Sequence, residues 1–309
     1  MNMEVVMDIR TDLAVEAVGV LKSKHKEYKN YGNLKVVETK VNKHLAKKIN
    51  KKEGDYYLID ISKEDINDST NLLKVESLLT KILKQILKKQ SITNKSKGLI
   101  VGLGNLNITP DSLGPKVIDK IAVTRHLFEL DETQVSDGVS NVCAVSPGVM
   151  GTTGIETCDI VKAIVDKIKI DYIIVIDALK ASEISRVNKT IQITNSGISP
   201  GSGVGNKRKE LSYDILGIPV IAIGVPTVVD AVTITTNTIE YLINFDKTQK
   251  ALGNFGDLSV NEKKELIDLV LTPMGLNMIV APKEIDIEIE NLSEIISGAI
   301  NHSLHKINT

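Results

Sequence analysis

The sequence predicts an α/β protein built as a three-layer sandwich with a largely parallel central sheet. Three short apolar runs, Gly98–Leu103, Tyr172–Ile176 and Pro219–Val225, are rich in Ile and Val and are bounded by Gly, Asp or Pro. Runs of this length and composition are typical of strands that are buried on both faces. Helical patterns separate them along the chain, and this alternation favours helices packed on both sides of a sheet. We find no internal repeat and no linker, so we expect one folded domain.

Two helices are predicted, one from its apolar face and the other from the pattern of its first residues. Between Asn71 and Lys89 the apolar residues recur at three- and four-residue steps, with lysines on the opposite face, as in an amphipathic helix. Ser259 is followed three residues later by Glu262, a pattern typical of a capping box. A helix is therefore expected to begin at about residue 259.

Near the C-terminus the sequence predicts a strand and then another helix. Isoleucines alternate with acidic residues over 285–290, and this period of two favours a half-buried strand. The helix is expected from about Leu292 to Leu304. Asn291 would be its N-cap, and Glu294 would complete a capping box.

Charge and composition exclude several classes of protein. The chain has 309 residues, with 38 Lys plus Arg against 39 Asp plus Glu and a formal net charge of -1, so it lacks the overall basic field that holds nucleic-acid phosphates. We interpret the lysine-rich stretch Lys22–Lys52 as a solvated surface. Cys143 and Cys158 are too few for a disulfide framework, which favours a reducing compartment. No apolar run is long enough to span a membrane and no secretion signal is present, so we expect a soluble cytoplasmic protein.

Two aspartates follow apolar runs of the predicted sheet. Asp177 comes directly after Tyr172–Ile176, and Asp111 follows Gly98–Leu103 by a short loop. Ligands of open α/β sheets collect at the carboxyl ends of the strands, so both side chains are expected at one edge of the sheet. A structural role as a helix cap is the alternative for each aspartate.

The expected surroundings of the two carboxyl groups differ. Asp111 directly precedes an apparent helix, whose free N–H groups and dipole would favour its ionised form. Asp177 ends an aliphatic run, where desolvation would favour its protonated form. A general base must be ionised and a general acid must be protonated, so two carboxyl groups with different protonation states can supply both roles. We therefore expect Asp111 to activate a water molecule and Asp177 to polarise the scissile carbonyl, although coupled carboxyls also permit the reverse assignment.

Two glycine-rich segments resemble nucleotide-binding loops incompletely. Gly102–Asn107 begins like a dinucleotide fingerprint, but Asn107 stands where the third glycine belongs, so nicotinamide binding ranks well below hydrolysis. In Gly201–Arg208 the residues before and after Lys207 do not fit a phosphate loop. It is either a surface loop or a rim that presents Lys207 and Arg208 to an acidic substrate.

Metal and nucleophilic catalysis have little support in the sequence. It contains no H-E-x-x-H, C-x-x-C or G-x-S-x-G motif, and neither cysteine has a histidine near it in sequence. We expect no metal or other cofactor. The five histidines are His25, His44, His126, His302 and His305.

Four segments carry a resemblance to a known family. Gly102–Pro115, Val123–Phe128, Ile176–Leu179 and Ser199–Glu210 resemble the spore germination proteases, and the similarity covers nearly the whole chain. The resemblance implies an atypical aspartic endopeptidase that begins the degradation of small acid-soluble spore proteins during germination. It places the two essential aspartates at Asp111 and Asp177.

The resemblance has further implications for fold, site and assembly. It implies a fold similar to the hydrogenase-maturation proteases, which are metal-dependent, so a metal-dependent endopeptidase with the same two aspartates as ligands is the alternative. It also implies a homotetramer in the forespore and spore core, without nucleic-acid or membrane binding. We expect Asn105, Asn107, Lys207 and Arg208 to bind the substrate.

The family is made as an inactive zymogen that removes its own N-terminal segment. Its substrates are cut after the first acidic residue of a Thr-Glu-(Phe or Ile)-Ala-Ser-Glu sequence, and residues 11–16 of this chain read Thr-Asp-Leu-Ala-Val-Glu. We therefore predict self-cleavage between Asp12 and Leu13. Residues 1–12 would then be the propeptide and residues 13–309 a single protease domain.

Overall fold

The computed structural model describes residues 12–14, 16–17, 26–201, 208–244, 258–271 and 278–305. Within these residues a nine-stranded sheet has the order β1-β2-β3-β7-β8-β6-β4-β5, and β9 pairs with β8. The strands are β1 (Lys26–Tyr31), β2 (Leu34–Val41), β3 (Gly54–Asp60), β4 (Gly98–Gly102), β5 (Val142–Val145), β6 (Tyr172–Lys180), β7 (Thr190–Thr194), β8 (Val220–Asp230) and β9 (Ile279–Val280).

The strand directions divide the sheet into two parts. Strands β5, β4, β6 and β8 are parallel to their neighbours in that group, and they include all three apolar runs identified in the sequence. The strands β7, β3, β2 and β1 extend the sheet in antiparallel pairing. The predicted α/β fold with a parallel sheet at its centre is confirmed, whereas the antiparallel extension is not anticipated by the sequence pattern.

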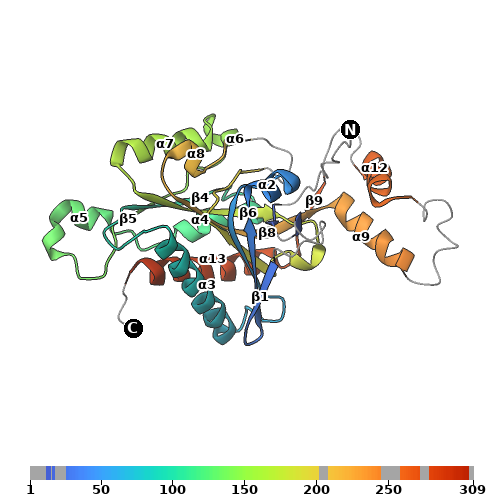
Figure 1. Cartoon of the computed structure of the whole chain (residues 1–309), viewed down its shortest axis with the longest axis horizontal. Helices are drawn as coiled ribbons and strands as arrows, with labels where there is room; N and C mark the ends of the chain where they lie inside the picture. The colour runs from blue at the N-terminus through green and yellow to red at the C-terminus, as the bar shows by residue number, and fades with distance from the viewer. Residues whose placement is uncertain are drawn as a thin grey trace.

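Helices cover both faces of the parallel strands (Figure 1). On one face α3 (Ser69–Lys89), α4 (Leu113–Ile118) and α13 (Ile285–Leu304) enclose the larger apolar core. On the other face α7 (Thr157–Ile168) and α8 (Tyr213–Leu216) enclose a second core. The remaining helices are α2 (Lys43–Ile49), α5 (Arg125–Asp131), α6 (Met150–Thr153), α9 (Ala231–Asn244) and α12 (Val260–Leu271), with 3-10 turns η1 (Thr109–Asp111), η2 (Glu132–Gln134) and η3 (Ile184–Arg186).

Two of the predicted helix starts can be compared with the structure. Helix α3 contains the predicted segment and begins two residues earlier, because the Asp68 carboxylate accepts hydrogen bonds from the N–H groups of Thr70 and Asn71. The capping box at α12 is confirmed: the Ser259 N–H donates to the Glu262 carboxylate, and the Glu262 N–H donates to the Ser259 hydroxyl.

The predicted strand over residues 285–290 is wrong, because these residues form the first turns of α13. Ile285, Ile289 and Leu292 are buried at helical spacing, whereas Ile287 is exposed. Burial of the helical face against α3 therefore outweighs the alternation along the chain. Asn291 consequently lies inside the helix rather than at its N-cap, and its side chain donates a hydrogen bond to Asn67.

Strands β6 and β8 extend beyond the apolar runs that predict them. β6 continues through Asp177 to Lys180, and β8 continues to Asp230. At their ends the buried Lys180 ammonium lies 2.7 Å from an Asp230 carboxylate oxygen. Asp177 is therefore a residue of the strand itself and not the first residue after it. Among the described residues, no helix is long and apolar enough to cross a membrane.

Candidate active site

Asp111 is held by the loop that follows β4. The Asn105 N–H donates to the Asp111 Oδ2 at 2.8 Å and also lies 3.1 Å from the Asp111 carbonyl oxygen. Gly104 has a φ of 112°, a conformation that favours glycine. From β8, the Thr227 hydroxyl donates to the Pro110 carbonyl at 2.7 Å. The aspartate and the residue before it are thus held by a backbone N–H of the loop after β4 and by a side-chain hydroxyl of β8.

The glycines that resemble a dinucleotide fingerprint serve close packing in this structure. A Cβ placed on Gly102 would lie 2.3 Å from the Gly114 carbonyl oxygen, and one on Gly114 would lie 2.2 Å from the Leu103 carbonyl oxygen. The end of β4 and the start of α4 therefore meet backbone to backbone. This contact fixes the helix that follows Asp111.

Asp177 shares a cavity with Asp111. It pairs with Gly224 of β8 in the strand register and is only 6% exposed. The cavity has a volume of about 210 Å³ and also includes residues from the loops that follow β4 and β5. Its lining comprises Leu103, Gly104, Asp111, Gly148, Val149, Met150, Glu156, Thr157, Asp177, Pro200, Gly201, Arg208 and Lys209. The prediction that the two aspartates meet at one edge of the sheet is confirmed.

The pKa values of both carboxyl groups are raised. Burial raises the pKa of Asp111 to about 6, against the opposing effect of the Asn105 N–H. Burial raises the pKa of Asp177 well above its usual value, and the charges of Asp111 and Asp12 raise it further. The expectation that a helix start would favour ionised Asp111 is wrong, because Asp111 ends the short turn η1 and burial outweighs the hydrogen bond it accepts. The pKa of Asp177 is raised, in the direction expected for a carboxyl group at the end of an aliphatic run.

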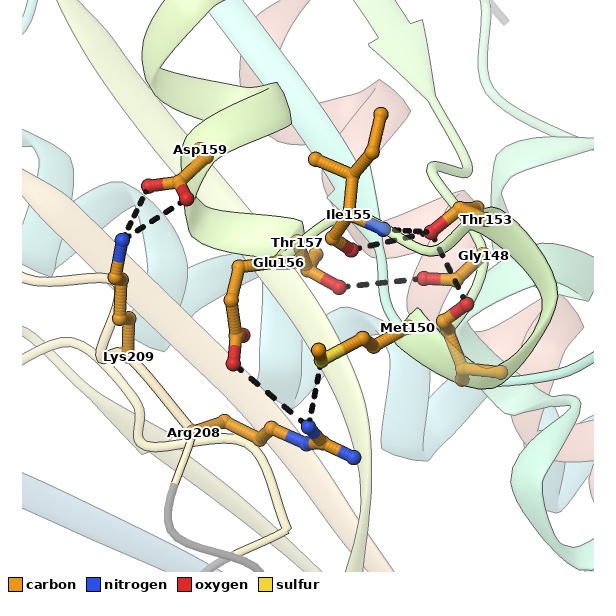
Figure 2. A network of polar contacts seen from close by, with 10 residues as sticks. Gly148, Met150, Thr153, Ile155, Glu156, Thr157, Asp159, Arg208 and Lys209 are labelled. Atoms are coloured by element: carbon orange, nitrogen blue, oxygen red, sulfur yellow. Dashed lines mark hydrogen bonds and ion pairs between the residues drawn. The ribbon is translucent and has the colours of Figure 1, made fainter.

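Two basic residues that line the cavity, Arg208 and Lys209, pair with neighbouring carboxylates (Figure 2). The Arg208 guanidinium lies 2.8 Å from the Met150 sulfur and 3.7 Å from a carboxylate oxygen of Glu156, the residue before α7. Lys209 lies 2.9 Å from both carboxylate oxygens of Asp159. Arg208 is thus placed at the site as the sequence suggests. Lys207 lies outside the described residues.

No motif in the sequence marks the part of the lining that follows β5. Gly148, Val149 and Met150 line the cavity because β5 is parallel to β4 and ends at the same edge. Asp111 is identified because ligands collect at the carboxyl ends of parallel strands, and the same rule would identify this loop. However, β5 spans only four residues, Val142–Val145, which is too short to stand out as an apolar run.

Of the two predicted substrate-binding asparagines, Asn105 makes its contacts within its own loop, and Asn107 is exposed. The Asn105 N–H positions Asp111, and its side-chain oxygen accepts a hydrogen bond from the Asn107 N–H at 3.0 Å. Neither residue is among the described lining of the cavity. The contact of Asn105 and Asn107 with substrate stays a prediction, whereas the structure gives Asn105 a role in positioning Asp111.

Residues 12–14 and 16–17 lie along the end of the strand that carries Asp177. The Asp12 N–H donates to the Lys180 carbonyl at 3.1 Å, and the Lys180 N–H donates to the Asp12 Oδ2 at 2.9 Å. Leu13 is fully buried. Asp12 also lines a second cavity of about 460 Å³, which shares Arg208 with the aspartate cavity. Asp12 of the predicted cleavage site therefore contacts the strand of Asp177 three residues beyond it and lines the neighbouring cavity.

The described histidines and cysteines do not form a metal site. His126 is exposed, His302 bonds to Glu76, and His305 contacts Ser140 and Ala122. Across the described ranges, no group of three His, Cys, Asp or Glu side chains is placed to hold a metal ion. A metal-dependent mechanism through the two aspartates therefore lacks a further ligand group in this part of the chain.

Comparison with known proteins identifies the family. A family model described as germination protease matches residues 4–246 and 242–309. The chain belongs to the germination protease family. The germination protease of Priestia megaterium is 41% identical over 346 aligned positions, which cover 96% of this chain and 94% of that protein. The germination protease of Oceanobacillus iheyensis is 40% identical over 98% of this chain and 96% of its own length.

Membership of the germination protease family makes the chain a protease of spore germination, a hydrolase that acts on peptide bonds. Among solved structures, the chain is similar to the NiFe hydrogenase maturation protease HycI from Thermococcus kodakarensis. The TM-score is 0.33 at 14% identity, and the match covers 71% of this chain and 98% of that one.

Proposed function

We propose that the chain is an endopeptidase that cleaves small acid-soluble spore proteins through the Asp111–Asp177 pair. The observation that carries this proposal is that both carboxyl groups line one cavity and that the Asp111 charge raises the pKa of Asp177. Two carboxyls that differ in protonation state can supply a general base and a general acid. The proposed setting is the spore core, after synthesis in the forespore.

The proposed reaction uses one water molecule and no covalent intermediate. Ionised Asp111 takes a proton from the water as its oxygen attacks the carbonyl carbon of the scissile bond. Protonated Asp177 donates a hydrogen bond to the carbonyl oxygen, where negative charge develops. The amine nitrogen leaves with the proton from Asp111, the carbonyl re-forms as a carboxylic acid, and Asp111 returns to its ionised form.

The test is the activity of the Asp111→Asn and Asp177→Asn variants. Each is expected to reduce kcat by a factor of about 100 or more, because general acid–base groups contribute about 10²–10⁴-fold. Asp286→Asn, which removes an exposed carboxylate on α13 outside the described cavity lining, is the control for the loss of a charge. Full activity in either Asp→Asn variant would contradict the mechanism, and restoration of a chelator-treated enzyme by one divalent ion would favour the metal-dependent alternative.

Self-processing between Asp12 and Leu13 is part of the same proposal, with residues 1–12 as propeptide and residues 13–309 as protease domain. It is supported by the contacts between Asp12 and Lys180, three residues from Asp177, and by the effect of the Asp12 charge on Asp177. A segment of the same chain is held at high effective concentration and would block the cleft until it is cut. N-terminal sequencing of the mature protein should begin at Leu13; any other first residue would refute this placement.

Acidic substrates and a homotetramer complete the proposed function. The rim residue Arg208, with Lys207 from the sequence, would attract substrates whose cleavage sites are flanked by acidic residues. Charge reversal at Arg208 should therefore raise the KM for acidic peptides, and an unchanged KM would remove it from the site. Light scattering of the purified chain tests the tetramer.

A further inference from the structure

Strand β8 contains one extra residue where it pairs with β6. Between consecutive residues of β6 the register passes from Pro226 to Val228, so Thr227 has no paired residue on that strand. A residue inserted in this way forms a β-bulge, which bends the strand and redirects a side chain. A proline inside a sheet is typical of such a position, because it has no N–H group to donate.

The side chain of the bulged residue contacts the turn that carries Asp111. The Thr227 hydroxyl donates to the Pro110 carbonyl at 2.7 Å, and Pro110 directly precedes Asp111 in η1. Thr227 is only 1% exposed, so solvent does not compete for this hydroxyl. The hydrogen bond therefore holds the turn at the residue next to the proposed general base.

Strand β8 connects the elements that carry the two catalytic aspartates. Asp177 pairs with Gly224 of β8, and Thr227 lies three residues farther along the same strand. One end of this short segment is thus joined to the strand of Asp177 and the other to the turn of Asp111. A change in the direction of the Thr227 side chain would move Asp111 relative to Asp177.

The backbone of the bulge is anchored on both sides of the extra residue. Before it, the Pro226 carbonyl accepts a hydrogen bond from the Asn188 N–H at 2.7 Å, and the Asn188 side chain donates to the Glu288 carboxylate of α13 at 2.7 Å. After it, the Val228 carbonyl accepts a hydrogen bond from the Ala181 N–H at 3.1 Å. These contacts fix the direction in which the bulged side chain points.

Thr227 is not placed to contact a substrate. It is absent from the described lining of the cavity that contains Asp111 and Asp177, and from that of the neighbouring cavity that includes Asp12. An effect of Thr227 on the reaction must therefore act through another residue, and the residue that its hydroxyl can move is Asp111.

We propose that Thr227 is a positioning residue: the β8 bulge directs its hydroxyl to the Pro110 carbonyl, and this contact sets where the Asp111 carboxylate lies relative to Asp177. The inference rests on the proposed role of Asp111 as general base, and it assigns a further residue to that reaction. It requires the hydroxyl group, and not the methyl group, of the threonine at this position.

The first test is the activity of Thr227→Val, which keeps the shape of the side chain and removes the hydroxyl. In the self-processed enzyme kcat should fall at least about tenfold while KM stays within about twofold, because a displaced reacting group weakens the transition state more than substrate binding. Thr227→Ser keeps the hydroxyl and should restore most of the lost kcat.

The second test is the pH profile of kcat/KM, which reports the ionisation of the free enzyme. In Thr227→Val the acid limb should move to lower pH, because a displaced turn exposes Asp111 to water and burial is what raises its pKa. The other charged residues in the described lining, which are Glu156, Asp177, Arg208 and Lys209, are the same in every variant.

The position of the acid limb is a property of the folded molecules, so a partly unfolded preparation still gives a valid result. Thr227→Ala also lacks the hydroxyl and is smaller than valine. It takes the place of Thr227→Val if the valine variant does not fold, and the same fall in kcat and the same shift of the acid limb are expected.

Thr236→Val is a matched control. Thr236 is a buried threonine of α9, 6% exposed, and its hydroxyl donates to the Val232 carbonyl at 2.7 Å. It lies outside the described lining of both cavities. A loss of stability caused by removing a buried hydroxyl should appear in both valine variants, whereas the fall in kcat and the shift of the acid limb should appear in Thr227→Val alone.

The possible failures are distinguishable. If Asp111→Asn loses activity but Thr227→Val keeps the wild-type kcat, the inference is wrong and the proposed function stands. The inference is also wrong if the acid limb of Thr227→Val stays at the wild-type pH, or if Thr227→Ser does not restore kcat, since Thr227 then supports the fold without positioning Asp111. If Asp111→Asn keeps full activity, the proposed function and the inference fail together.

Discussion

Gly104 and Asp111 are in contact at the turn after β4: a Cβ on Gly104 would lie 2.0 Å from the Asp111 carbonyl oxygen and 3.1 Å from its Oδ1. The φ of Gly104 is also positive, at 112°. Residue 104 therefore limits where the carboxylate of Asp111 can lie. A side chain at this position must displace the loop that presents the proposed general base.

We expect Gly104→Ala to reduce kcat by about 100-fold, because a shift of roughly 1 Å in a reacting group can have an effect of that size. Backbone strain should also lower the free energy of unfolding by about 1–3 kcal/mol. Steady-state kinetics and denaturant unfolding measure the two effects. Gly151→Ala is the control, since a Cβ there meets no atom within 4 Å; equal activity loss in both variants would contradict the explanation.

The pH dependence of peptide cleavage should have an acid limb near pH 6. Asp111 acts as a base only when ionised, and burial raises its pKa to about 6. Activity should therefore fall as the pH decreases through that value, by about tenfold per pH unit below it. A profile of kcat/KM against pH, measured with a neutral peptide, tests this. Constant activity from pH 7 down to pH 4 would contradict the assignment of Asp111 as base.

Asp177→Asn should stabilise the folded protein at neutral pH while removing activity. The pKa of Asp177 is raised in the folded state, mainly by burial, so the folded state binds a proton more tightly than the unfolded state. The contribution of Asp177 to the free energy of unfolding is therefore fully present at pH values below the pKa of the group in the unfolded chain. It is lost as the pH rises towards the pKa of the group in the folded protein. The asparagine side chain does not ionise, so Asp177→Asn avoids this loss of stability at neutral pH.

Thermal unfolding measured at two pH values tests this prediction. The melting temperature of Asp177→Asn should exceed that of the wild type at pH 7. The difference should shrink at pH 4, where the carboxyl of the unfolded chain is already about half protonated because its ordinary pKa is about 3.9. A lower melting temperature at pH 7 would show that the carboxyl makes contacts that an amide cannot replace.

The buried ion pair between Lys180 and Asp230 should contribute strongly to stability. The exposed fractions of these side chains are 1% and 4%, and removal of one partner leaves a buried charge. Lys180→Met should therefore reduce the free energy of unfolding by about 3–5 kcal/mol. Arg125→Gln, which breaks an ion pair with the 61% exposed Glu129, should cost at most about 1 kcal/mol. Equal losses in denaturant unfolding would contradict this comparison.

The sequence is sufficient for the parallel sheet and for the meeting of the two aspartates. Tyr172–Ile176 and Gly98–Leu103 are apolar throughout because the strands are buried on both faces, and that pattern is local. The start of α13 depends on residues distant in sequence, since Ile285 and Ile289 are buried by packing against other helices. Alternation of isoleucine with acidic residues therefore predicts the wrong element there.

The pKa of Asp111 and the site at which the buried Glu16 carboxylate contacts Ser182 and Arg186 show a second limit of sequence-based prediction. The pKa of Asp111 depends on how much protein covers it, which residue order alone does not show. The Glu16 site combines residue 16 with residues 182–186, and no motif marks these residues. Their common feature is the turn after β6, whose position is known only when the true length of that strand is known.

The extension of β6 beyond Asp177 has a consequence for how this enzyme can change over evolutionary time. Asp177 and the contacts of Lys180 with Asp12 occupy one continuous strand, only three residues apart. A substitution that shifts the register of this strand would alter both the position of Asp177 and the contact between Asp12 and Lys180 in one event. Sequence changes that alter the timing of the proposed self-processing without affecting catalysis are therefore expected in the N-terminal residues that contact β6. They are not expected in β6 itself.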